Sequence, residues 1–157
     1  MQKRAYLNSR RINGWPAAIE LERIFLSAKK QDWLFAENDG ASLTIDGLYE
    51  TANLPSRDQV TVILYMMGNP THGVYLLYSR WDGRNRSKID LNSKGDLSRL
   101  GEFVRSMHGD RISAGLFIPI DAAWLAVREF TELDGELPKS VEWIASKDLP
   151  PEAFPPL

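Results

Sequence analysis

The chain has 157 residues, of which 43% are hydrophobic and 25% charged, with a formal net charge of −2 and no cysteine. This length and composition are typical of one globular domain with its own core, so we expect a single domain over residues 1–157, in which 1–12 and 149–157 are extended or loosely ordered. The lack of cysteine excludes disulfides, thiolate metal sites and a cysteine nucleophile, and the slightly negative charge argues against a dedicated nucleic-acid binder.

No segment has the pattern of a targeting or membrane sequence. Residues 1–11 carry four basic residues and no acid, but no apolar core follows them, so they predict no signal peptide. No stretch approaches the roughly 18 uninterrupted apolar residues of a membrane span. We therefore expect a cytoplasmic protein that makes no contact with a membrane.

The first predicted helix follows the Asn13-Gly14 turn and Pro16, a residue that suits the first helical position. Its apolar residues recur at the spacing of one helix face over about three turns. They are Ala18, Leu21, Phe25 and Ala28. Two strands, over 33–36 and 42–45, then flank a strong hairpin turn over 38–40.

Residues 60–67 are almost continuously apolar, which predicts a strand buried on both faces. A turn-rich segment over 68–73 joins it to a second strand over 74–81, so the two form a hairpin. The next predicted element is a second helix that begins at Asp96, a suitable N-cap, and ends at Gly109. Its apolar side would consist of Leu97, Leu100, Val104 and Met107.

A short strand over 112–118 leads to the third predicted helix, which runs from Asp121 to Asp134 and has Gly135 in the stop position. The apolar residues in register on this helix are Ala123, Val127 and Phe130. A strand over 141–145 follows. Strands that are adjacent in sequence and separated by turns favour an α+β fold, with a mostly antiparallel or mixed central sheet and about three helices packed against it.

The sequence contains no recognisable catalytic apparatus. It has neither a Gly-rich phosphate loop nor a Gly-x-Ser-x-Gly nucleophile elbow. His72 and His108 lie in different turns without a second ligand at helical or hairpin spacing, so we expect no metal site. The carboxylates three or four residues apart between Glu129 and Glu136 are typical of a solvated helix face. We therefore expect no enzyme activity.

Two polar segments are candidates for binding a macromolecule. Residues 80–88 combine four basic residues with a tryptophan around an Asp-Gly turn, a composition found in protein-interface hot spots and also in single-stranded nucleic-acid sites. The alternative is that the tryptophan packs in the core and the charges solvate a loop. Residues 129–157 hold seven acids and two lysines, which would suit a basic partner, although an ordinary solvated surface gives the same pattern. The candidate contact residues are Arg80, Trp81, Arg84, Arg86, Asp134, Glu136 and Glu142.

The run over 118–130 and the segment over 134–143 carry a resemblance to a known family. An Ile-Pro opens a helix that bears Ala-Val and Glu-Phe, and a Gly-x-x-Pro turn then leads to a strand with Trp. This pattern resembles the ending of the first-numbered family of immunity proteins from bacterial polymorphic-toxin and contact-dependent growth inhibition systems. The residues that carry it are scaffold residues that fix the helix, the turn and the core. They are Pro119, Asp121, as the helix cap, Val127, Phe130, Gly135, Pro138 and Trp143.

The resemblance implies a small α+β protein that binds a cognate toxin domain, such as a nuclease or deaminase, and covers its active site without a cofactor. The partner surface varies between pairs, so it is not transferred residue by residue, and the formation of homo-oligomers is left open. Two competing functions remain. One is a nucleic-acid-binding or regulatory module that uses the basic hairpin over 80–88, and the other is an enzyme whose active residues come from distant segments.

Overall fold

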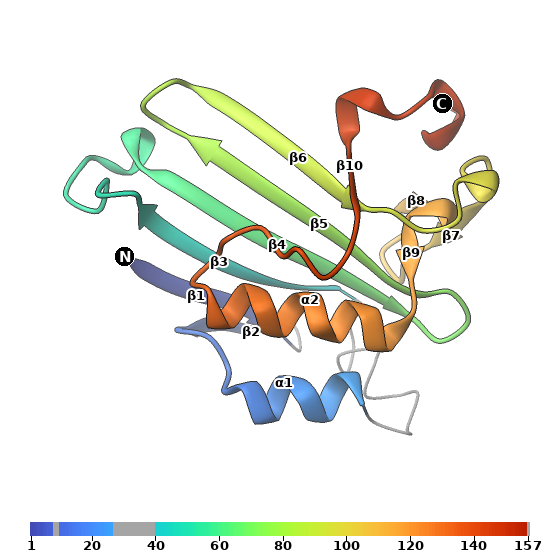
Figure 1. Cartoon of the computed structure of the whole chain (residues 1–157), viewed down its shortest axis with the longest axis horizontal. Helices are drawn as coiled ribbons and strands as arrows, with labels where there is room; N and C mark the ends of the chain where they lie inside the picture. Colours follow the sequence, from blue (N-terminus) through green and yellow to red (C-terminus); the bar gives the residue numbers. More distant parts are fainter. Residues whose placement is uncertain (8–9, 27–39, 157) are drawn as a thin grey trace.

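The computed structural model describes residues 1–7, 10–26 and 40–156. An antiparallel sheet runs through the protein in the order β10-β6-β5-β4-β3-β1-β2, and β9 pairs with β5 (Figure 1). A separate two-stranded ladder consists of β7 and β8. The elements are β1 (Gln2–Leu7), β2 (Arg10–Asn13), α1 (Ala18–Phe25), β3 (Gly40–Leu48), β4 (Val60–Asn69), β5 (Gly73–Asp82), β6 (Ser87–Ser93), β7 (Phe103–Arg105), β8 (Arg111–Ser113), β9 (Phe117–Ile118), α2 (Ile120–Glu132) and β10 (Trp143–Ala145).

The helices cover one face of the sheet, and this face holds the main core. The inward residues of β4 alternate along the strand and are fully buried; they are Val60, Val62, Leu64 and Met66. On the opposite face Ile63 is 37% exposed, and Thr61 and Tyr65 are half-buried. The prediction that this strand is buried on both faces is therefore wrong over its first half, because both helices lie on the same side.

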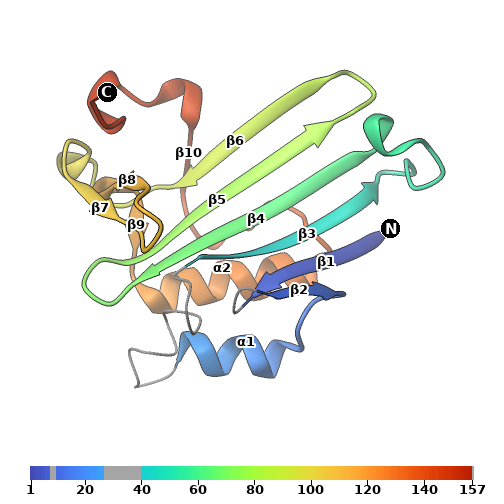
Figure 2. The same ribbon diagram turned by 180° about the vertical axis from the view of Figure 1, so that it is seen from behind.

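A second, smaller core covers one end of the other face, which Figure 2 shows with the β7–β8 hairpin at that end. Met67 and Tyr75 of the central hairpin pack there against Leu100 and Val104. The C-terminal segment contributes Ala153, which is 5% exposed. The same segment includes a short 3₁₀ helix over Pro151–Ala153.

Helix α2 confirms the third predicted helix. Its residues Val127 and Phe130 are completely buried against the sheet. The helix ends where Gly135 N–H donates to the Phe130 carbonyl at 2.9 Å, with Asp134 and Gly135 both at positive φ, a Schellman-type ending. A Cβ at Gly135 would lie 2.7 Å from Cγ2 of Ile45, so only glycine fits this close approach to β3.

The predicted beginnings of both helices need correction. Asp121 does not cap α2, because Pro119 occupies the N-cap position and the Asp121 carboxylate accepts from the N–H of the adjacent Ala122. Helix α1 begins at Ala18 after Ala17, so Pro16 precedes the helix rather than opening it. Leu21 and Phe25 are buried as expected, whereas Ala28 and the strand and turn predicted over 33–39 lie outside the described residues.

The second predicted helix is wrong, and the described residues form two helices rather than about three. Asp96 does cap a helical turn, since its carboxylate accepts from Ser98 N–H at 3.0 Å, but the turn is a 3₁₀ helix over Leu97–Arg99. Gly101 weakens a continuing helix, and β7 instead pairs with β8. In this irregular segment the side chains of Leu100 and Val104 are buried.

The remaining strand predictions are partly confirmed. The hairpin of β4 and β5 matches the expectation, and residues 42–45 lie within β3. The strand expected over 112–118 is divided into β8, a 3₁₀ turn and β9, and the strand expected over 141–145 is shortened to β10. Residues 2–7 and 10–13 are paired strands. No helix in the described ranges is long and apolar enough to span a membrane.

We expect Phe130→Ala to lower the free energy of unfolding by about 3–5 kcal/mol, because it leaves a cavity among side chains that cannot collapse into it. Phe130 is completely buried, and its ring lies 5.3 Å from that of Trp15 and 6.2 Å from that of Tyr78. Urea unfolding followed by circular dichroism measures the change. The control is Phe154→Ala, at a phenylalanine that is 51% exposed, and equal losses in the two variants would contradict this core assignment.

Candidate functional site

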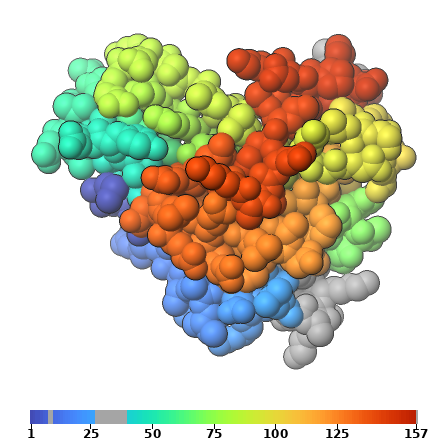
Figure 3. Space-filling view, in the orientation of Figure 1, coloured from blue at the N-terminus to red at the C-terminus, as the bar shows by residue number. Residues whose placement is uncertain are grey.

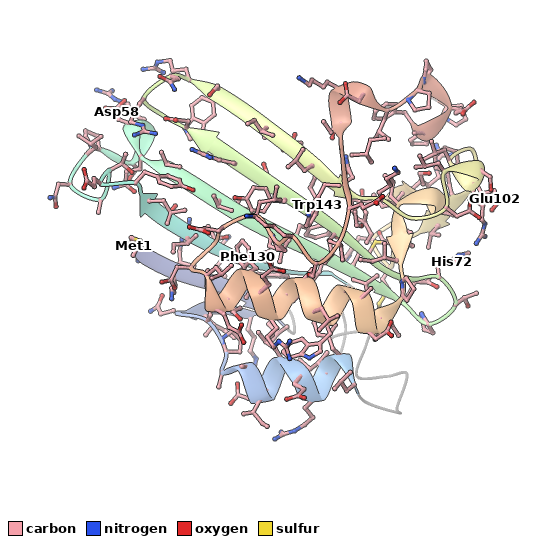
Figure 4. All side chains as sticks on the ribbon, viewed as in Figure 1. Met1, Asp58, His72, Glu102, Phe130 and Trp143 are labelled. Atoms are coloured by element: carbon pink, nitrogen blue, oxygen red, sulfur yellow. The ribbon has the colours of Figure 1, made fainter. Side chains whose placement is uncertain are left out.

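A cleft of about 320 Å³ lies between the β5–β6 hairpin and the segment that connects α2 to β10. Arg80 from the predicted basic segment and Glu136 from the predicted acidic segment both line it, so the structure brings together two regions that are 56 positions apart in the sequence. The full lining is Tyr49, Tyr78, Arg80, Ile89, Leu91, Glu136, Leu137 and Lys139. Figure 4 shows Phe130 and Trp143, two of the scaffold residues, on the same side of the sheet as α2.

Tyr49 and Arg80 are in direct contact at the cleft. The Arg80 guanidinium carbon lies 4.7 Å from the centroid of the Tyr49 ring, a cation–π geometry. Tyr49 and Glu50 directly follow β3 and adopt φ values of 54° and 64°. Two consecutive non-glycine residues in the left-handed region are strained, and such strain is concentrated at functional sites. The turn therefore holds an exposed tyrosine at the cleft at a cost in backbone energy.

Tyr78 connects the sheet to the end of α2. Its hydroxyl donates to the Gly135 carbonyl at 3.0 Å, and the side chain is buried. Burial raises the pKa of Tyr78 to about 12, so the phenol keeps its proton at physiological pH and remains a donor. This bond fixes the position of the residues that follow the helix relative to the central strand.

The wall opposite the hairpin is also held by hydrogen bonds. The Glu129 carboxylate accepts from Lys139 N–H at 2.8 Å and from Ser140 N–H at 3.1 Å, and these bonds lower the pKa of Glu129. Trp143 Nε1 donates to the Pro138 carbonyl at 2.8 Å. The segment over 138–140 is thus anchored to α2 and to β10, so the cleft is preorganised. Glu129 has a structural role here.

The four basic-hairpin candidates do not form one surface. Arg80 and Trp81 are adjacent in β5, so their side chains point to opposite faces; Arg80 faces the cleft, and Trp81 lies across from Thr61 on the open face. Arg84 forms an ion pair with Asp82, with Nη2 and Oδ2 2.9 Å apart. Arg86 lies in the exposed turn at φ 53°.

The three acidic candidates are also separated. Asp134 forms an ion pair with Lys3, with 2.6 Å between Oδ1 and Nζ. Glu142 lies 3.4 Å from Lys94 before β10. Glu136 alone of the three lines the cleft. These three residues therefore do not form one acidic C-terminal patch. The structure instead favours a cleft of mixed charge around Arg80 and Glu136.

The histidines lie far from this cleft. Figure 4 shows His72 at the β4–β5 turn, at the opposite end of the strands from the β5–β6 hairpin. His108 lies in the turn between β7 and β8. Within the described part of the chain, no group of three or more His, Asp or Glu side chains could hold a metal ion.

Sequence reasoning missed the aromatic and apolar part of the cleft. Tyr78 shares a face with Arg80 because they are two residues apart in a strand, and this signal was available. Ile89 and Leu91 pair with Arg80 and Tyr78 and could be found only once β6 was recognised. Tyr49 has no sequence signal, because its position depends on a left-handed turn that is rare for tyrosine.

The β5–β6 hairpin beside the cleft is stabilised by hydrogen bonds to the Asp82 carboxylate. Its Oδ1 accepts from Arg84 N–H and Nε at 3.0 and 3.1 Å, and its Oδ2 accepts from Nη2 at 2.9 Å. These bonds to Arg84 lower the pKa of Asp82 to about 2. The carboxylate therefore contributes stability that is complete above the unfolded pKa of about 3.9 and is lost as the pH falls towards 2.

We expect Asp82→Asn to lower the free energy of unfolding near pH 6, and we expect this loss to shrink between pH 4 and pH 2. Urea unfolding of both proteins across this pH range measures the difference. Asp110→Asn, at an exposed carboxyl in the β7–β8 turn, is the control for a general effect of charge. A loss of unfolding free energy in Asp82→Asn that stays constant down to pH 2 would contradict this stabilising role of the Asp82 carboxylate.

A known protein family matches the part of the chain that contains this cleft. A family model described as Immunity protein Imm1 matches residues 49–145, more than half of the chain. The matched range begins at Tyr49 and includes every residue that lines the cleft. A search of curated proteins and a search of solved structures gave no match. The matched range contains α2, the cleft and strands β4 to β10, whereas β1, β2 and β3 precede it. The chain therefore belongs to the Imm1 family of immunity proteins.

Proposed function

We propose that the protein binds a cognate bacterial toxin domain, a nuclease or a deaminase, and neutralises it by covering the active site. It acts as a single domain in the cytoplasm of a cell that carries a polymorphic-toxin or contact-dependent inhibition system, and it needs no cofactor. Membership of an immunity protein family supports the general role. The position of the toxin contact rests on the cleft, which is the observation that carries the proposal.

The cleft has the composition of an interface hot spot. Tyr49 is 46% exposed and Ile89 is 49% exposed, so two large side chains offer apolar surface at its rim. Arg80 and Glu136 add charges of both signs. Arginine and tyrosine dominate binding energies in alanine scans when a rim excludes water around them. A toxin side chain in this cleft would gain apolar burial and a charged partner together.

The cleft is too small to form the whole contact. A stable interface buries about 800 Å² on each partner, so the toxin must also cover residues around the cleft. The β5–β6 hairpin with Arg84 and Arg86 lies on one side, and Lys139 lies on the other. Toxins that act on nucleic acid present basic groups to phosphates, and Glu136 is the acid in the cleft that such a surface would meet.

The competing nucleic-acid function receives less support from this geometry. Trp81 and Arg80 lie on opposite faces, and Arg84 is neutralised by Asp82. A continuous basic and aromatic surface for stacked bases would need these side chains on one face. The basic residues of the hairpin are better placed to orient a protein partner.

We expect Arg80→Ala to weaken the binding of the toxin domain about tenfold or more, because alanine removes both the cation and its contact with Tyr49. The probe is the C-terminal domain encoded immediately upstream, inactivated and titrated by calorimetry. Arg99→Ala, at an arginine paired with Glu102 in the 3₁₀ helix away from the cleft, is the matched control.

Two failures of this experiment have different meanings. If the upstream domain binds the wild-type protein and both alanine variants equally well, the cleft is not the contact, although the immunity role stands. If the upstream domain neither binds nor poisons cells that lack this protein, the proposed function itself is wrong.

A further inference from the structure

Strand β6 has an open edge next to the cleft. Its partner β10 pairs only with residues 91–93, whereas β5 pairs with β6 from Ser87 to Asn92. Figure 1 shows β10 meeting the end of β6 and leaving the rest of the strand at the sheet margin. Residues 87–90 therefore have a ladder partner on one side and, among the described residues, none on the other.

The hydrogen-bond pattern shows which backbone groups face this edge. Lys94 N–H donates to the Glu142 carbonyl on the β10 side at 3.0 Å. Because alternate residues of a strand bond to the same neighbour, the backbone groups of Asn92, Asp90 and Lys88 point to that side as well. Asn92 lies across from Ile144, but no strand of the described ranges lies across from Asp90 or Lys88. The N–H and C=O groups of Lys88 and Asp90 thus form one row of four backbone groups that are available for hydrogen bonds.

The space beside this edge is hollow. A cleft of about 450 Å³ is bounded by residues 88–91 of the edge and by residues 145–147, where the chain turns away from the sheet. Figure 3 shows it as a notch between the β5–β6 hairpin and the C-terminal segment. The edge is accordingly accessible to another strand rather than covered by its own chain.

The side chains of this edge are complementary to those of the same edge in a second copy of the chain. In an antiparallel pair of two copies with Ile89 on the twofold axis, Lys88 of each copy lies opposite Asp90 of the other. A lysine normally protects an edge strand from such pairing. Here Lys88 already pairs with Asp90 of its own chain, with Nζ and Oδ2 3.6 Å apart, and the Lys-x-Asp spacing lets two copies exchange these for two ion pairs between chains. Ile89 is 49% exposed, and Oδ1 of Asp90 is buried without a hydrogen-bond partner in the described structure.

We propose that two copies of this chain associate through these edges, with Ile89 facing Ile89 and Lys88 facing Asp90 across a twofold axis. The exposed isoleucines cover each other, and the two backbone rows exchange four hydrogen bonds. Ala145 already lies opposite Leu91, so the ladder is limited to residues 88–90. An interface this short is weak, and we expect a reversible dimer at about micromolar concentrations and above. Because Ile89 also lines the toxin-binding cleft proposed above, the dimer places both clefts beside the axis.

The absence of cysteine from the sequence allows a sharp test. Residues opposite each other in a non-hydrogen-bonded pair have Cα atoms about 4.5 Å apart, which suits a disulfide. We expect Ile89→Cys to form a disulfide-linked dimer under mild oxidation, seen on a non-reducing gel and by mass spectrometry. Ser87→Cys is the matched control, because its two copies would lie about 13 Å apart. Equal cross-linking of both variants, or of neither, would overturn the proposal.

A charge exchange gives a second readout without cysteine. Asp90→Lys should abolish the dimer measured by sedimentation equilibrium, and the double exchange Lys88→Asp with Asp90→Lys should restore it. Thermal unfolding of each variant verifies that it folds. A double variant that folds and stays monomeric under conditions where the wild type is dimeric would contradict the pairing. Neither experiment contains a toxin, so its outcome is independent of the proposed function.

Discussion

The burial of the apolar stripe of α2 against one face of the sheet is the constraint on which the rest of the structure depends. Phe130 and Val127 are completely buried against the alternating residues of β4. The helix can approach this closely because Gly135 leaves room for Ile45 at its end. The Tyr78 hydroxyl then ties the Gly135 carbonyl to β5, so the segment after the helix has one position relative to the sheet.

The cleft follows from this constraint. With the end of α2 fixed, the chain must run along the sheet to reach β10, and Glu129 and Trp143 hold it there through backbone hydrogen bonds. The β5–β6 hairpin extends beyond the region that the helix covers, so Arg80 faces the connecting segment across an open space. The Pro, Gly and Trp residues between Pro119 and Trp143 thus form the scaffold that positions one wall of the cleft.

The elements that the sequence predicted correctly are those in which one periodic pattern and one stop signal agree. Helix α2 meets that condition, and the β4–β5 hairpin follows a comparable one, an apolar run that ends at a turn-rich segment. The failed helix after Asp96 does not, because Leu100 and Val104 have helical spacing but serve a small core built from a 3₁₀ turn and a short ladder. Such a core is set by contacts distant in sequence. The residues of the cleft have the same limit: the charges of Arg80 and Glu136 are visible in the sequence, whereas Tyr49 reaches the cleft through tertiary structure alone.

The central claim, that the cleft beside α2 contacts the toxin, is most directly tested by thiol protection. With no native cysteine, Lys139→Cys at the cleft and Ile63→Cys on the open sheet face each provide one reactive group. The measured quantity is the rate of alkylation of each cysteine with and without the inactivated toxin domain. We expect strong slowing at position 139 and little change at position 63. Protection at position 63 with unchanged reactivity at position 139 would place the toxin on the other face and contradict the account.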